Sequence, residues 1–161
     1  MLLLGLLTVL LVSHFEHLIN QATILAVFIS TITGASGNAG TQSLAVAIKR
    51  IANNDDEESR LKIMANEVLT GILIGGVTGV IIWILVGAWK ANFILGFVVG
   101  IAMFFAIIVA NLIGCLIPMV MEKFNVDPSV ASGAFISTLS DVTSLLIYFL
   151  FAQMFLQFLV V

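Results

Sequence analysis

The sequence has little charge and only one cysteine, and each scarcity excludes a class of protein. Charged residues make up 9% of the 161 positions and hydrophobic residues 61%, more apolar surface than a soluble domain of this size could bury. The lone Cys115 excludes a disulfide within the chain. The chain has six basic residues, a formal net charge of −3 and no basic patch, so we do not expect it to bind nucleic acid. The composition therefore predicts a protein of the lipid bilayer.

Long apolar segments divide the sequence into candidate membrane spans. A bilayer core about 30 Å thick needs about 20 apolar residues per helix. We expect five spans in one transmembrane domain, at about residues 2–15, 22–51, 61–89, 92–121 and 128–159. No signal-peptide cleavage site follows the first apolar stretch, so we expect it to remain as an anchor. Asp127 followed by Pro128 is a typical helix start and marks the fifth span, whereas Pro118 is expected to bend or end the fourth.

The basic residues predict an orientation in the plasma membrane. Four of the six lie between Lys49 and Lys62, Lys123 lies in a second connection, and Lys90 alone lies in the connection near residue 90. Cytoplasmic loops carry an excess of Lys and Arg. We therefore expect the N-terminus in the cytoplasm and the C-terminus outside.

Glycines at four-residue spacing predict close contacts between helices. Gly71, Gly75 and Gly79 lie in the third span, and Gly96 and Gly100 in the fourth. Such spacing lets membrane helices approach closely. We interpret these glycines as packing positions, with self-association through the third span as the alternative.

Asp141 is an acid in a span that is otherwise apolar or small. If the fifth helix starts at Asp127, Asp141 lies about 20 Å along it, near the middle of the bilayer. Ionised side chains at that depth are costly and mark ion or proton pathways. A buried aspartate that is hydrogen-bonded or protonated is the alternative. The residues expected on its helical face are Ala134, Ser137, Thr138, Ser144, Leu145 and Tyr148.

A polar, glycine-rich segment, GASGNAGTQS from Gly34 to Ser43, interrupts the second span. Its glycines, Gly37 and Gly40 among them, are expected to loosen the helix and turn backbone carbonyls towards protein or a water-filled cavity. Packing between helices could also explain the glycines, but it explains Asn38 and Gln42 less well. We expect this segment, including Thr41, to line a pore together with the residues around Asp141.

One carboxylate per chain is too few for a divalent cation, because hard cations take several oxygen ligands. A two-fold homodimer would bring two Asp141 side chains to one axis. A wide site with two acids suits Mg²⁺, which dehydrates reluctantly and keeps several waters.

Other polar residues are weaker candidates. Glu67 could lie at the inner pore mouth, or it could reach the cytoplasmic interface or pair with a base there. Asn111 is expected to make an interhelical hydrogen bond. The acidic segment at residues 53–59 could sense cations, but we favour a role at the start of the third helix. His14 and His17 with Glu16 resemble half of a zinc site, and an interfacial role for them is favoured.

Four stretches resemble the membrane domain of the MgtE-type magnesium channels. They are FE at residues 15–16, GNAGTQSL at 37–44, NEVLTG at 66–71 and DPSVASGAFISTLSDVTSLLIYF at 127–149. The resemblance covers essentially the whole chain, in order. It implies five helices per subunit in a homodimer, with an ion path at the dimer interface lined by the second and fifth spans. It also implies that Asp141 binds the ion, that the Ser137 carbonyl lies beside it, and that Glu16 is a candidate for the pore mouth.

The sequence departs from the family pattern in two ways. Ser144 stands where the family usually has glycine, which bears on selectivity. Family members usually carry cytosolic regulatory domains before the first helix, including a nucleotide-sensing CBS pair, and we expect none in this chain, so that closure by cytosolic Mg²⁺ through them would not operate.

The predicted function is a homodimeric channel that passes Mg²⁺ into the cytoplasm, with Mg²⁺ and the bilayer as partners. An ion-coupled divalent transporter is the nearest alternative, and Glu67 is its candidate second site. A non-transporting membrane scaffold is another. We do not expect an enzyme, because no nucleophile or second acid accompanies Asp141 within the membrane.

Overall fold

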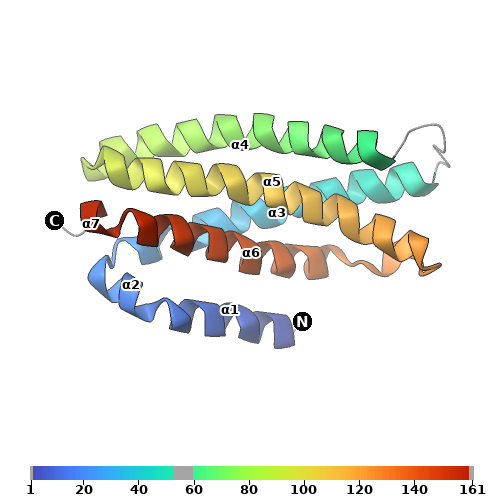
Figure 1. The fold of residues 1–161 in the computed structure, drawn as a ribbon, viewed down its shortest axis with the longest axis horizontal. Helices are drawn as coiled ribbons and strands as arrows, with labels where there is room; N and C mark the ends of the chain where they lie inside the picture. The colour runs from blue at the N-terminus through green and yellow to red at the C-terminus, as the bar shows by residue number, and fades with distance from the viewer. Residues whose placement is uncertain (1, 53–59, 160–161) are drawn as a thin grey trace.

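The computed structural model describes residues 2–52 and 60–159, and in these residues every regular element is helical. The acidic segment at 53–59 therefore lies outside the described residues. The helices lie side by side, and successive long helices run in opposite directions, so that α3 and α5 run one way and α4 and α6 the other (Figure 1). Their bounds are α1 Leu2–His14, α2 Glu16–Gln21, α3 Leu25–Ala52, α4 Arg60–Lys90, α5 Phe93–Lys123, the 3₁₀ turn η1 Pro128–Val130, α6 Gly133–Met154 and α7 Leu156–Leu159.

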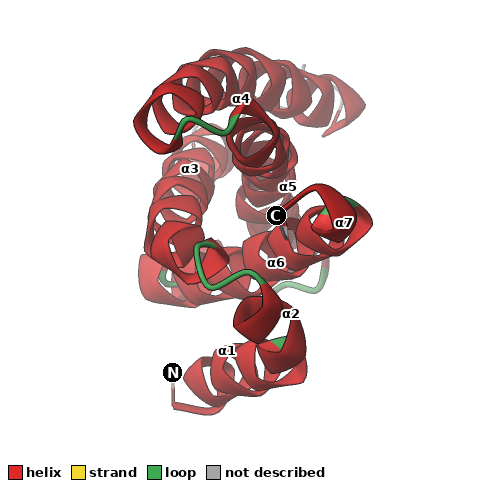
Figure 2. Cartoon of the chain, turned by 90° about the vertical axis from the view of Figure 1, so that its left-hand side faces the viewer, coloured by secondary structure: helices red, strands yellow, loops and turns green. Residues whose placement is uncertain are grey.

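The central helix is α5, which packs against α4 on one side and against α3 and α6 on the other. Most residues on the outer face of α4 are exposed and apolar, such as Leu73 and Val77. At the opposite side of the bundle, α1 packs on α6 (Figure 2). The core thus lies along α5, and α4 presents a surface suited to lipid.

Within the described residues, three helices are long and apolar enough to cross a membrane: α4 from Leu61, α5 and α6. The other two expected spans differ from these in composition or length. In α3 the polar segment from Gly34 to Ser43 lowers the mean hydropathy, and α1, with 13 residues, is only about 20 Å long. An all-helical membrane fold is thus supported, while the number of five spans remains a prediction.

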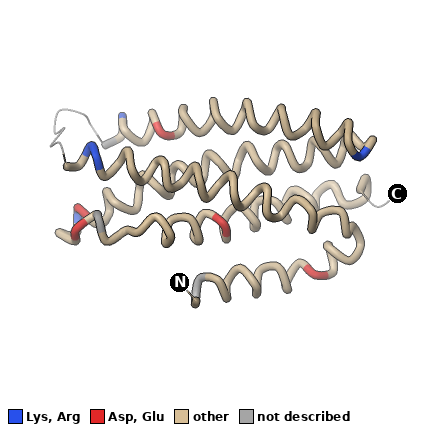
Figure 3. The backbone as a smooth tube through the Cα atoms, turned by 180° about the vertical axis from the view of Figure 1, so that it is seen from behind, with Lys and Arg blue, Asp and Glu red and all other residues tan. Residues whose placement is uncertain are grey.

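The connections between helices alternate between the two ends of the bundle (Figure 1). The end of α3, the start of α4 and the α5–α6 connection lie at one end, and α1 starts short of that end. At the other end lie α2, α7 and the tight α4–α5 turn, in which Ala91 has a φ of 51° and the Asn92 side chain accepts a hydrogen bond from the Leu95 N–H. Charged residues gather towards these ends (Figure 3).

The prediction for the start of the fifth span was wrong. Pro128 begins the short turn η1, and α6 starts only at Gly133, after the N-cap residue Ser132. The Ser132 hydroxyl accepts a hydrogen bond of 3.2 Å from the Phe135 N–H, which satisfies an otherwise unpaired donor of the first turn. Asp141 consequently lies about 12 Å from the start of its helix rather than 20 Å.

Of two expected disturbances of helices, the loosening of α3 does not occur, and α5 does not end at its proline. The glycine-rich segment does not loosen α3, which is helical from Leu25 to Ala52 without a break. Hydroxyl groups along it donate to carbonyls one turn back, as Ser36 does to Thr33 and Thr41 to Gly37, so these groups are satisfied within the helix. Pro118 lies inside α5, which continues to Lys123, so this proline does not end the helix.

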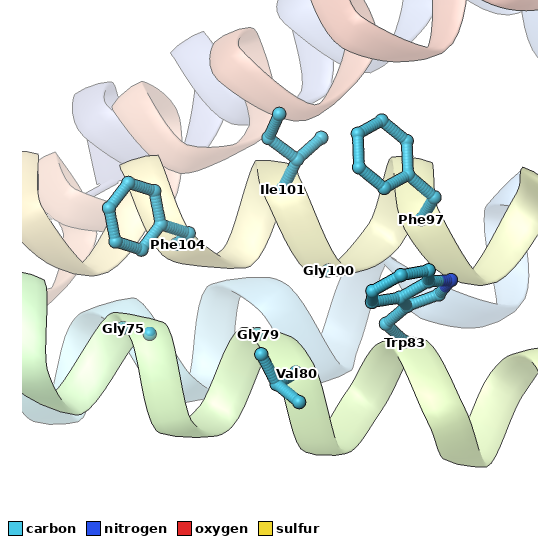
Figure 4. Close-up of a pocket in the computed structure, with 9 residues that line it drawn as sticks. Gly75, Gly79, Val80, Trp83, Phe97, Gly100, Ile101 and Phe104 are labelled. Carbon is cyan, nitrogen blue, oxygen red and sulfur yellow. The ribbon is translucent and has the colours of Figure 1, made fainter.

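The four-residue glycine spacing serves packing within one subunit, as predicted. A Cβ added to Gly79 would lie 2.8 Å from the Gly100 carbonyl oxygen, and one added to Gly75 would lie 2.8 Å from the Phe104 carbonyl oxygen. Backbones of α4 and α5 therefore touch where the glycines are. Beside this contact the two helices form an apolar groove of about 340 Å³ that Trp83 and Phe97 border (Figure 4).

Candidate functional site

Asp141 lies where α6 contacts the glycine-rich segment of α3. A Cβ added to Gly37 would stand 2.7 Å from the Ser137 hydroxyl and 3.1 Å from Asp141 Oδ1. The missing side chain of Gly37 thus leaves the space that these two polar groups occupy. The structure brings together three residues that the sequence predicted for the site, from positions about a hundred residues apart, and Asp141 itself is half-buried.

The hydroxyls around Asp141 are engaged by their own helix. Thr138 Oγ1 donates to the Ala134 carbonyl at 2.8 Å, and Ser144 Oγ donates to the Asp141 carbonyl at 2.9 Å. Ala134 is exposed and Thr138 half-buried, but Ser144 is buried within the subunit. Ser144 therefore does not lie on the surface where we expected it to line an ion path, because α6 turns that side towards its neighbours.

The later part of the predicted Asp141 face is also internal. Leu145 and Tyr148 are fully buried, and the Tyr148 hydroxyl donates to the Leu25 carbonyl at 2.9 Å. This hydrogen bond attaches α6 to the start of α3. Only the first turns of the face, up to Asp141, remain partly open.

On α3 the glycines and the polar residues of the segment point in different directions. Gly40 is buried, and a Cβ there would lie 2.6 Å from the Ser140 hydroxyl of α6. Asn38 and Gln42 are exposed and Thr41 is half-buried. Packing thus explains Gly37 and Gly40, and the amides lie on an open face. The exposed small and polar residues of this face are Ser30, Thr31, Gly34, Asn38 and Gln42.

Glu67 is enclosed by the helices and does not reach an interface. Its side chain is 7% exposed, and its Oε2 lies 2.8 Å from Ser43 Oγ. Asn111 is buried beside it and makes the predicted interhelical contact. In the orientation that satisfies both of its polar atoms, its amide donates to the Ala39 carbonyl and accepts from the Gly71 N–H, each at 3.1 Å. Because the side chain is buried, the predictions that Glu67 reaches the cytoplasmic interface or opens onto a pore mouth are not supported within one subunit.

Of two serines near the site, Ser140 escaped the sequence analysis and Ser43 was predicted only as part of the pore-lining segment. Ser43 contacts Glu67, and Ser140 has a buried hydroxyl for which the structure gives no hydrogen-bond partner. Serines in a membrane helix are common, so their spacing alone gave no signal. Their importance depends on which helix packs against them.

The histidines and Glu16 lie at the α2 end of the bundle and are exposed. His17 Nε2 and Gln21 Nε2 are 3.0 Å apart, and the His14 ring packs edge-on against Phe15. Among the residues that the structure describes, no three His, Cys, Asp or Glu side chains form a group able to hold a metal ion. Glu16 remains a prediction for a pore mouth.

A family model described as a divalent cation transporter, MgtE, matches residues 29–151. This range holds most of α3 and α6 and all of α4 and α5, and with them Gly37, Ser137 and Asp141. The chain belongs to the MgtE family. Its membership agrees with the resemblance seen in the glycine-rich and aspartate motifs.

Three curated relatives are each named magnesium transporter MgtE. The protein from Enterococcus faecalis is 56% identical over 99% of this chain, that from Bacillus subtilis 39% over 98%, and that from Thermus thermophilus 32% over 98%. The chain spans about a third of their length, at 36%, 35% and 35%. The similarity thus extends over all the helices that the structure describes.

Proposed function

We propose that this chain forms a homodimeric channel that passes hydrated Mg²⁺ down its electrochemical gradient into the cytoplasm. One observation carries the proposal. Asp141 Oδ1 and the Ser137 hydroxyl occupy the space beside Gly37 that a side chain at that position would fill. An acid on one membrane helix thereby adjoins the polar segment of another. The names of the three relatives support Mg²⁺ as the transported ion.

The exposed face of α3 supports a dimer. Asn38 and Gln42 lie on this face within a helix that is apolar before it, and lipid tails offer amides no hydrogen-bond partners. A second subunit, with water between the two, would satisfy them. Because a single acid binds a hard divalent cation poorly, two Asp141 carboxylates facing each other would supply the charge.

The proposed mechanism keeps water on the ion. Mg²⁺ sheds its hydration shell reluctantly, so the two Asp141 carboxylates would accept hydrogen bonds from its water ligands and balance its charge. The residues proposed to line the path beside them are Ala134, Ser137, Thr138, Gly37, Asn38 and Thr41. The site then needs no cage of several ligands in one subunit. We also propose that the N-terminus lies in the cytoplasm, because this places the two connections richest in Lys and Arg on the cytoplasmic side.

Mg²⁺ uptake into liposomes tests this proposal. Purified protein is reconstituted with a trapped fluorescent Mg²⁺ indicator, and an inside-negative potential is imposed on wild type and on Asp141→Asn. We expect uptake that rises with the potential and falls at least about tenfold in the variant, because Asn removes the charge and keeps the shape. Equal uptake by both forms would contradict the role of Asp141.

The same liposomes distinguish the alternatives. A coupled transporter would stop when no gradient of a second ion is present, whereas a channel would continue. A scaffold would give no uptake in the wild type. Size-exclusion profiles of both forms in detergent serve as the control for folding.

A further inference from the structure

The groove between α4 and α5 opens on the side of the bundle that is suited to lipid. Every residue that lines it is glycine, aliphatic or aromatic. Gly79 and Gly100 lie at its base, where the two backbones touch. Trp83 and Phe97 stand at one end and Phe104 at the other (Figure 4). The groove therefore offers an occupant apolar contact along its whole length.

The one polar atom on a lining side chain is already engaged. Trp83 Nε1 donates a hydrogen bond of 3.1 Å to the Phe93 carbonyl oxygen. The Trp83 ring also packs edge-on against Phe97, with ring centres 5.8 Å apart. These contacts hold the ring in place as a wall of the groove. Because its N–H is satisfied, the groove has no hydrogen-bonding side chain to offer, and hydrocarbon is the chemistry that it fits.

The groove is too narrow for another helix. It extends from Gly75 to Trp83, eight residues or about 12 Å along α4, and has a volume of about 340 Å³. Its mean cross-section is thus about 28 Å², whereas a helix that is 10–12 Å across with its side chains needs about three times that area or more. An extended hydrocarbon chain, whose carbon atoms contact neighbours at about 3.5–4.0 Å, is narrow enough to enter.

A positive charge lies beyond the Trp83 end of the groove. Lys90 follows Trp83 by seven residues, which is about 10 Å along α4 and nearly two full turns, so both lie on the same side of the helix. Its Nζ is 3.9 Å from the centre of the Trp89 ring. In the sequence it is the only charged residue between Glu67 and Glu122. Tryptophan and lysine at the end of a membrane helix are typical of the headgroup level.

We propose that the groove binds one acyl chain of an anionic phospholipid whose phosphate pairs with Lys90. The distance from Lys90 to Gly75 is 15 residues, about 22 Å along α4. This is somewhat more than half of the bilayer core of about 30 Å, which is the depth that one lipid with its headgroup spans. The charge of Lys90 favours an anionic headgroup over a zwitterionic one, which carries a cation of its own. This binding does not depend on the proposed Mg²⁺ transport.

Quenching of Trp83 fluorescence by brominated lipids tests the proposal. The chain has two tryptophans, so Trp89→Phe leaves Trp83 as the only reporter and keeps an aromatic ring beside Lys90. This protein is reconstituted in phosphatidylcholine vesicles with a small, equal fraction of brominated phosphatidylglycerol or brominated phosphatidylcholine. We expect up to about fivefold stronger quenching by phosphatidylglycerol, the preference that one lysine near the headgroups supplies.

Two results of this measurement would contradict the proposal. Equal quenching by the two lipids would mean ordinary contact with the surrounding bilayer and no selected lipid. Little quenching by either would mean that protein, such as a second copy of the chain, covers the groove. Either result overturns the proposal whether or not the protein transports Mg²⁺.

Variants in the Trp89→Phe background locate the bound lipid. Lys90→Gln should abolish the excess quenching by phosphatidylglycerol. Gly76→Phe should also abolish it, because Gly76 lines the groove and a Cβ there meets nothing within 4 Å, so the ring can fill the groove without a clash. Val77→Phe is the matched control, since Val77 is 61% exposed and does not line the groove.

The control should keep the excess quenching. An excess that persists in Lys90→Gln or Gly76→Phe, or that also vanishes in Val77→Phe, would overturn the assignment to this groove. Thermal unfolding in detergent checks that each variant folds. If Gly76→Phe does not fold, Lys90→Gln at the end of α4 still decides whether the lysine selects the lipid.

Discussion

At the scale of single residues, the candidate ion site depends on the absence of a side chain at one glycine. Gly37 has no Cβ, and the Ser137 hydroxyl and Asp141 carboxylate fill the vacant space. The acid is thereby held beside α3 without a bulky neighbour. Replacing glycine by alanine inside a helix favours the helix itself by about 1 kcal/mol, so any loss caused by this change must come from the site.

We predict that Gly37→Ala lowers Mg²⁺ uptake at least about tenfold. The new Cβ would stand 2.7 Å from Ser137 Oγ and 3.1 Å from Asp141 Oδ1, so the serine or the acid must move away. Uptake into indicator-loaded liposomes is the measurement. Gly76→Ala is the matched control, because a Cβ there meets nothing within 4 Å, and it should transport like wild type. Normal uptake by Gly37→Ala would show that this contact does not shape the ion path.

Sequence patterns predicted which residues meet at the site better than they predicted which residues are buried. Gly37, Ser137 and Asp141 were expected together, and they meet. By contrast, Ser144 and Glu67 were expected near a path and are buried within the subunit. Spacing along one helix says which residues share a face, but the neighbouring helix decides whether that face is open.

At the scale of elements, glycines set the distances between helices. Gly79 and Gly100 bring the α4 and α5 backbones into contact, and such contacts replace the hydrophobic driving force that is absent in lipid. The face of α4 that carries its glycine repeat is thus used within the subunit. Self-association through that face would have to displace α5.

We predict that Gly79→Ala destabilises the protein by about 1–3 kcal/mol, as overpacking of a tight contact does. Its Cβ would lie 2.8 Å from the Gly100 carbonyl oxygen, and a backbone atom cannot rotate away, so the two helices must separate. Thermal unfolding in detergent measures the change. Gly76→Ala, three residues earlier on α4, should unfold at the wild-type temperature or slightly higher. A Gly79→Ala variant as stable as this control would argue against the contact.

The long helices were predicted to within a few residues, since hydropathy and end residues define them. Residues 22–51, 61–89 and 92–121 correspond to α3 Leu25–Ala52, α4 Arg60–Lys90 and α5 Phe93–Lys123. The start of α6 was missed because two start signals follow each other. Pro128 can begin a 3₁₀ helix as well as an α-helix, and here it begins η1. The N-cap of α6 is Ser132.

At the scale of the whole molecule, one subunit leaves two different surfaces. The outer face of α4 is apolar and suits lipid, whereas the exposed face of α3 carries Asn38 and Gln42. A polar face in the bilayer calls for a partner that can form hydrogen bonds. The sequence could not predict which face is exposed, because this depends on the positions of α5 and α6.

We predict that a cysteine at position 38 cross-links two subunits in the membrane. With Cys115→Ala removing the native thiol, Asn38→Cys should give a covalent dimer on treatment with a short bis-maleimide, as seen by denaturing electrophoresis. Leu73→Cys is the control, because Leu73 is 62% exposed on the apolar face of α4 and should not cross-link. Equal dimer formation at both positions, or none at position 38, would contradict the proposed interface.

The two-residue turn at Ala91 and Asn92 has a consequence for the order in which the chain folds. Closing so short a connection costs little conformational entropy, and the α4–α5 pair draws all its mutual contacts from residues 60–123. The contact of Tyr148 with Leu25 joins residues 123 positions apart, and Gly37 meets Asp141 across a similar separation. During synthesis the α4–α5 hairpin can therefore form before α6 emerges, and the candidate ion site can be completed only after the first turns of α6 have been made.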